Sequence, residues 1–147
     1  MTKPTPPELR KLAQRILAIE AAGTQPADAE SPAMFRVCEK LRRSLSRLTG
    51  LDGFRSLLSR ALALAGEEVG WFKAVRVMSD GSLVGLDEVE KQISPREIAK
   101  GEIILITKLM GLLVTFIGEG LTFRLLQQTW PEVSFDNLDS ERRKSDG

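Results

Sequence analysis

The chain has 147 residues and lacks two side-chain types altogether, histidine and tyrosine. Without histidine it has no imidazole to serve as a general base or as a metal ligand. The glycine-rich phosphate-binding motifs and the GxSxG motif of serine hydrolases are also missing. We therefore expect a protein that is not an enzyme, with no catalytic residues, no metal site, no cofactor and no small-molecule substrate.

Cysteine and net charge are also scarce. The single Cys38 cannot form an intramolecular disulfide, which favours a reducing compartment. The first residues lack the apolar stretch of a secretory signal. Both observations predict a cytoplasmic protein. Because 21 basic and 20 acidic residues leave a net charge of +1, the chain as a whole has no general attraction to nucleic acid or to an anionic membrane.

Aromatic residues make up only 5% of the chain, whereas hydrophobic residues make up 42%. Leucine, isoleucine, valine and alanine must therefore build the core, which favours helices. The spacing of the apolar residues predicts a mainly α fold of about five helices packed around one long apolar C-terminal helix, with a minor two-stranded β-hairpin. We divide the chain into an N-terminal tail, helix and linker (1–30), a helical core domain (31–133) with the hairpin near 74–86, and a disordered tail (134–147).

The longest apolar stretch, residues 103–130, is the centre of the predicted core. Ser94 is a good N-cap, Pro95 suits the first helical turn, and Pro131 ends the helix. The helix is either continuous or broken within the segment 118–120, because its two glycines destabilise a helix interior.

This long helix has two unequal sides at about 100° per residue. The broad side is large and apolar, so it must be covered by other helices, by a partner chain or by lipid. Lipid is the weakest of these, because charged residues interrupt the run too closely for a membrane span. The narrow side is small or polar and lets another backbone approach closely. We predict that this narrow side is the partner-binding surface, made of Lys108, Gly111, Thr115, Gly118, Glu119 and Thr122.

Three shorter helices are predicted before the long one, over residues 8–22, 31–49 and 54–65. Ser31 and Pro32 start the second of these as N-cap and first helical residue. Only a short turn separates the second and third helices, so they form an αα-hairpin.

The β-hairpin is predicted from Asp80 and Gly81, which stand between apolar residues. We expect its strands over about 74–78 and 83–86. Because an isolated two-stranded ribbon is only marginally stable, it must pack on the helices.

Basic residues are concentrated in the αα-hairpin. Residues 31–66 carry seven lysines and arginines against two acids, and residues 67–147 carry ten against fourteen. A basic αα-hairpin resembles a helix-turn-helix in outline, although the net charge of the domain argues against it. The possible nucleic-acid-binding residues are Arg36, Lys40, Arg42, Arg43 and Arg47.

Three functions follow from these patterns. The first is a non-enzymatic protein–protein interaction or regulatory module that binds a protein partner or a second copy of itself. The second is a nucleic-acid-binding helical domain that uses the basic hairpin. The third, with the weakest support, is a membrane-active protein that releases its long helix.

Overall fold

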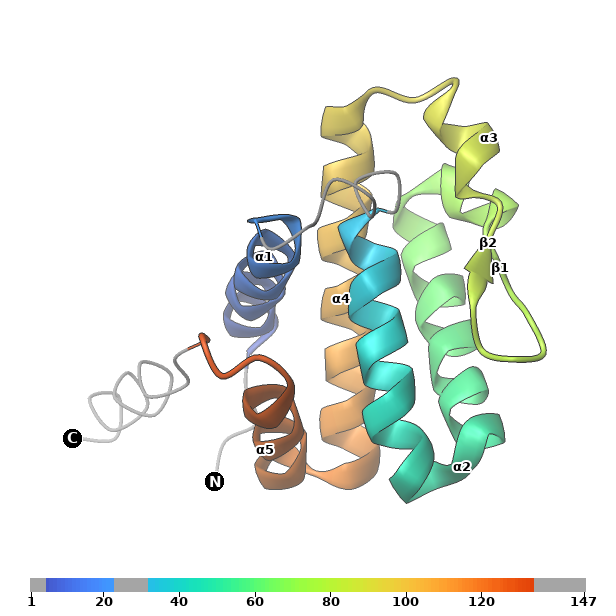
Figure 1. The fold of residues 1–147 in the computed structure, drawn as a ribbon. Coiled ribbons are helices and arrows are strands. Elements are labelled where there is room, and N and C mark those ends of the chain that lie inside the picture. The colour runs from blue at the N-terminus through green and yellow to red at the C-terminus, as the bar shows by residue number, and fades with distance from the viewer. Residues whose placement is uncertain (1–4, 23–31, 134–147) are drawn as a thin grey trace.

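The computed structural model describes residues 5–22 and 32–133. It is mainly helical, with one small antiparallel sheet, as the sequence predicted (Figure 1). The elements in chain order are α1 (Pro6–Ala22), α2 (Ala33–Glu68), the 3₁₀-helix η2 (Gly70–Ala74), β1 (Arg76–Val77), β2 (Leu83–Val84), α3 (Leu86–Glu90), α4 (Pro95–Ile117) and α5 (Glu119–Thr129).

Helix α4 forms the centre of the fold, with α1, α2 and α5 packed around it (Figure 1). Its side chains Leu105, Ile106, Leu109 and Met110 are completely buried. The prediction of a central apolar helix is therefore confirmed. Helix α1 contributes buried leucines and isoleucines to the same hydrophobic core as the rest of the described chain. Within the described residues, none of the helices combines the length and the hydropathy needed to cross a bilayer.

The ends of α4 are set by the residues that the sequence singled out. The Ser94 hydroxyl accepts a hydrogen bond from the Glu97 backbone N–H at 3.2 Å, which caps the helix. At the other end Gly118 adopts φ 91° and ψ 158°, a conformation open essentially to glycine alone. The helix therefore breaks at Gly118, and α5 turns back from it (Figure 1).

The predicted αα-hairpin is present within α2. Gly50 has φ 75° and ψ 163°, and there the chain reverses, so that residues 51–68 run back beside residues 33–49 (Figure 1). The turn is shorter than expected, because helical geometry resumes directly after Gly50.

The start of α2 differs slightly from the prediction. Pro32 occupies the N-cap position instead of the first helical turn, and Ser31 lies outside the described residues. The capping hydrogen bond comes from another helix, since the Glu102 carboxylate of α4 accepts the Met34 backbone N–H at 2.8 Å. This hydrogen bond between two helices replaces the local side-chain cap.

The β-hairpin is confirmed but shorter than predicted. Arg76 pairs with Val84 and Val77 with Leu83, and Gly81 in the turn has φ 85°. The second strand stops at Gly85, which has φ 104°, and a Cβ there would lie 2.1 Å from the Ala74 carbonyl oxygen. A backbone approach this close requires glycine.

Candidate interaction surfaces

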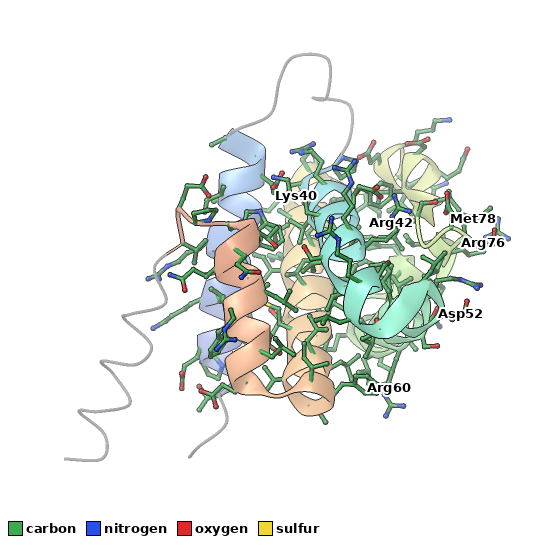
Figure 2. All side chains as sticks on the ribbon, turned by 60° about the horizontal axis from the view of Figure 1, so that its bottom comes forward. Lys40, Arg42, Asp52, Arg60, Arg76 and Met78 are labelled. Carbon is green, nitrogen blue, oxygen red and sulfur yellow. The ribbon has the colours of Figure 1, made fainter. Side chains whose placement is uncertain are left out.

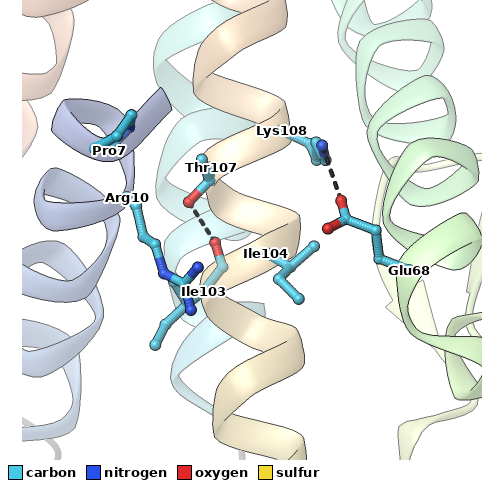
Figure 3. Close-up of a pocket in the computed structure, with 7 residues that line it drawn as sticks. All are labelled: Pro7, Arg10, Glu68, Ile103, Ile104, Thr107 and Lys108. Atoms are coloured by element: carbon cyan, nitrogen blue, oxygen red, sulfur yellow. Dashed lines mark hydrogen bonds and ion pairs between the residues drawn. The ribbon is translucent and has the colours of Figure 1, made fainter. Parts of the chain in front are cut away.

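The outer face of α4 forms the floor of a hollow of about 380 Å³ between α1 and the last turn of α2 (Figure 3). We call this hollow the α4 groove. It is lined by Pro7 and Arg10 from α1, Glu68 from α2, and Ile103, Ile104, Thr107 and Lys108 from α4.

The groove has an apolar floor and charged walls. Ile103 and Ile104 are half-buried in the floor. The Lys108 ammonium lies 2.9 Å from the Glu68 carboxylate, and both side chains are partly exposed. An ion pair of this kind adds little to stability because water competes for both charges. Arg10 stands exposed on the opposite wall, so the groove offers two cations and one anion to a binding partner.

The predicted partner-binding residues are divided by the break at Gly118. Lys108, Gly111 and Thr115 lie on α4, where Lys108 lines the groove, Thr115 is exposed and Gly111 is half-buried. Glu119 and Thr122 belong to α5, which points in another direction. Thr122 is only 1% exposed, and its hydroxyl donates to the Gly118 carbonyl at 2.7 Å. Only an unbroken helix would place all six residues on one continuous stripe. Because the helix breaks at Gly118, the structure does not contain that stripe.

Gly101 lies on the narrow side of α4, N-terminal to Ile104, and it is covered by Trp71 of η2. A Cβ on Gly101 would lie only 2.2 Å from the Trp71 ring. Trp71 in turn stacks on Phe72, with ring centroids 4.1 Å apart. Gly101 therefore serves packing within the chain, and the open part of the narrow side of α4 begins at Ile104.

The basic residues of α2 form ion pairs with two acids. Arg36 and Lys40 contact Glu20 of α1, and Arg42 and Arg43 contact Glu39. Arg42 also donates to the Asp80 carbonyl oxygen at 3.1 Å, which places it beside the β-hairpin (Figure 2). Arg47 is exposed on the same helix. Arg36 and Lys40 are thereby held against α1 and Arg42 against the β-hairpin, whereas the Arg43 pair with Glu39 lies within α2.

Glu20 is a buried polar centre that the sequence reasoning missed. It is 6% exposed, and its carboxylate accepts a hydrogen bond of 2.8 Å from the indole N–H of Trp130, which follows α5. The cluster joins α1, α2 and the end of α5. The sequence does hold a signal for it, since Glu20 continues the i, i+3, i+4 spacing of the buried residues Leu9, Ala13 and Ile16.

Burial raises the pKa values of two side chains, Cys38 and Glu102. Burial raises the pKa of the Cys38 thiol to about 12, and the nearby Glu102 and Glu39 carboxylates add to the shift. The thiol therefore stays protonated at neutral pH and is a buried core side chain. Burial also raises the pKa of Glu102, although the Met34 N–H hydrogen bond opposes this.

Comparison of the chain with protein families, with characterised proteins and with solved structures finds no match. In residues 5–22 and 32–133, no three His, Cys, Asp or Glu side chains are grouped so that they could hold a metal ion.

Proposed function

We propose that the chain is a non-enzymatic protein-interaction module whose α4 groove receives an amphipathic helix of a partner protein. The observation that carries this proposal is the uncovered face of the central helix. Helix α4 is buried by its own chain along Leu105, Ile106, Leu109 and Met110, yet Ile103 and Ile104 line an open hollow. We further propose the cytoplasm as its location, since the single cysteine favours a reducing compartment.

A helical occupant suits the shape of the groove. Helix-in-groove recognition places the apolar face of one helix between helices of another protein. Here α1 and the end of α2 are the walls and α4 is the floor. The α4 residues that line the hollow run from Ile103 to Lys108, roughly 8 Å at the helical rise, which matches between one and two turns of a bound helix.

The charges of the groove favour an acidic partner helix. Arg10 and Lys108 stand on either side of the apolar floor, and Glu68 is the only acid among the lining residues of the hollow. A partner carboxylate could contact Arg10 or take the place of Glu68 beside Lys108. Such contacts select the partner and its orientation more than they add affinity, whereas Ile103 and Ile104 supply the apolar contact.

The test is site-specific photo-crosslinking followed by a binding measurement. A benzophenone amino acid in place of Ile104 should crosslink one partner segment, whose sequence should show apolar residues at i, i+3 and i+4 and at least one acid. Thr107→Arg places a long charged side chain in the hollow and should weaken binding of that segment by about tenfold or more. Lys100→Glu, an exposed change on the same helix outside the groove, is the control and should leave binding unchanged.

Two outcomes would contradict the proposal. One is a partner that binds the Thr107→Arg variant as tightly as the wild type. The other is a crosslinked segment that is basic or extended. The intact circular dichroism spectrum of each variant would show that the fold is preserved.

Nucleic-acid binding through the basic face of α2 is the alternative function. Its support is weaker, because Arg36, Lys40, Arg42 and Arg43 already form ion pairs within the chain. A salt-sensitive gel shift that disappears when Arg43 and Arg47 are changed to glutamate would favour it over the groove.

A further inference from the structure

Large exposed apolar side chains gather at one end of the helix bundle. Among the described residues there are five such side chains, and four of them flank the two chain reversals at Gly50 and Gly118. These two reversals lie at the same end of the bundle (Figure 1). We call this the reversal end. Its four apolar side chains and their exposed fractions are Leu48 (53%), Leu51 (38%), Phe116 (66%) and Leu121 (37%).

The backbone explains why these side chains remain uncovered. Gly50 and Gly118 have nearly the same conformation, with φ 75° and ψ 163° at one and φ 91° and ψ 158° at the other. Each ends one helix and starts the next without a loop. In both cases a Cβ would have nothing within 4 Å. Within residues 5–22 and 32–133, no other segment covers the apolar side chains on either side of these tips.

The size of the apolar surface fits a small protein interface. The four side chains are between 37% and 66% exposed, which corresponds to about a few hundred Å² of apolar surface, the range of the largest apolar patches on ordinary monomers. A standard interface buries about 800 Å² on each partner, a little over half of it apolar. The four apolar side chains of the reversal end therefore suit the centre of a modest interface, and the charged residues beside the two reversals suit its polar rim.

The charges around this surface are mixed. Asp52 follows the first reversal and is 97% exposed, whereas Arg47 precedes that reversal and is also exposed. At the second reversal, α5 carries Glu119 in its first turn and the exposed Arg124 one turn later. An anionic membrane or a strongly charged partner would favour one sign of charge. A surface that carries both signs beside each reversal fits a second copy of itself, because an acid beside one reversal can face a base beside the other, and a two-fold contact makes this pairing twice.

We propose that the reversal end is a self-association surface, at which two copies of the chain dock end to end about a two-fold axis. The Gly50 reversal of one copy meets the Gly118 reversal of the other, so Leu48 and Leu51 contact Phe116 and Leu121, and Asp52 faces Arg124. The interface is small, so the dimer is weak and reversible. The α4 groove lies on the side of the bundle and stays open, which gives the dimer two grooves.

Sedimentation equilibrium of the full chain over a concentration series tests this proposal. The wild type should show a reversible monomer–dimer equilibrium below about 1 mM. The double variant Leu48→Ser, Phe116→Ser should weaken dimerisation by about tenfold or more. Both side chains are more than half exposed, so the unfolding midpoint should stay close to that of the wild type. Thr107→Arg, the groove variant, should leave the dimer unchanged, which separates this proposal from the proposed function.

A charge exchange tests the two-fold pairing. Asp52→Arg and Arg124→Asp should each weaken the dimer, and the two together should restore it. Glu97→Arg, an exposed change at the opposite end of α4, is the control for altered net charge and should have no effect.

Three results would overturn the proposal. The first is a strict monomer throughout the concentration series. The second is a dimer that persists in the Leu48→Ser, Phe116→Ser variant, since the contact would then lie elsewhere. The third is a monomeric wild type that sediments with vesicles of phosphatidylcholine and phosphatidylglycerol and loses this property in the same double variant, which would assign the reversal end to lipid.

Discussion

The two ends of the bundle are held in different ways. At the reversal end the chain turns at Gly50 and Gly118, the hydroxyls of Thr49 and Thr122 donate to the carbonyls of these two glycines, and apolar side chains face solvent. At the opposite end, which we call the capped end, Trp71 covers Gly101 and the Glu102 carboxylate caps α2 at Met34. Long-range contacts thus stabilise the capped end, whereas the hydrogen bonds at the two reversals join residues that are close in sequence. The capped end is therefore the more strongly connected of the two, and the reversal end is the surface that we propose for self-association.

The largest expected effect is at Gly101 in the capped end. Alanine there would bring a Cβ to 2.2 Å from the Trp71 ring. The ring is half-buried, packed against the core and beside Phe72, so we expect Gly101→Ala to lower the free energy of unfolding by about 3 kcal/mol. Urea unfolding followed by circular dichroism measures this change.

Gly111 on the same helix is the matched control. A Cβ there would meet only Leu9, at an ordinary contact distance of 3.8 Å. Gly111→Ala should therefore raise stability by about 0.5–1 kcal/mol, because alanine favours a helix interior more than glycine does. Equal effects of the two substitutions would refute the close contact between Trp71 and Gly101.

A smaller effect is expected at Gly118 in the reversal end. A Cβ at Gly118 meets no atom within 4 Å, so the cost comes only from the backbone. Its φ of 91° and ψ of 158° are strained for any L-residue with a side chain, and Gly118→Ala should cost about 1–2 kcal/mol.

Gly120, two residues further on, provides the comparison for this prediction. It lies within α5 and also has open space around its Cβ position. Gly120→Ala should be neutral or slightly stabilising. A neutral result for Gly118→Ala as well would mean that the reversal does not depend on its glycine.

The features predicted from the sequence are those with local signals. Ser94 and Gly118 mark helix ends through their own residue types, and Asp80 with Gly81 marks the β-turn, so these elements lie where they were expected. The second strand ends earlier than predicted, at Gly85, where the Ala74 carbonyl oxygen leaves no room for a Cβ. Ala74 is eleven residues away in the chain, so the alternation of residues within the strand does not reveal this contact.

The features that could not be predicted join residues far apart in the chain. Met34 and Glu102 are separated by 68 residues, and Glu20 and Trp130 by 110. A buried acid on an apolar helix side predicts that some partner exists, but only the assembled fold selects which one. The candidate site shows the same limit. The sequence placed Lys108 on a small or polar face of the long helix, whereas the walls that make that face a groove come from α1 and α2.

The smallest expected effect is the pH dependence of the Glu102 cap in the capped end. Burial raises the pKa of Glu102 above its ordinary value of 4.5, against the opposing effects of the Met34 N–H and the Arg36 charge, and Glu90 adds to the rise. A carboxyl group whose pKa is higher in the folded state binds protons more tightly there. Its contribution to stability is therefore fully present below the ordinary pKa and is lost as the pH rises through the folded-state pKa.

Glu102→Gln isolates this contribution, because the amide oxygen can still accept the Met34 N–H but does not titrate. Lowering the pH from 7 to 5 should stabilise the wild type relative to Glu102→Gln, by no more than about 1 kcal/mol. Urea unfolding at the two pH values measures the difference, with Glu97→Gln on the exposed face of the same helix as the control. A wild type that instead loses stability relative to Glu102→Gln on acidification would show that the Met34 hydrogen bond outweighs burial, and that the charged form of Glu102 is the one the capped end favours.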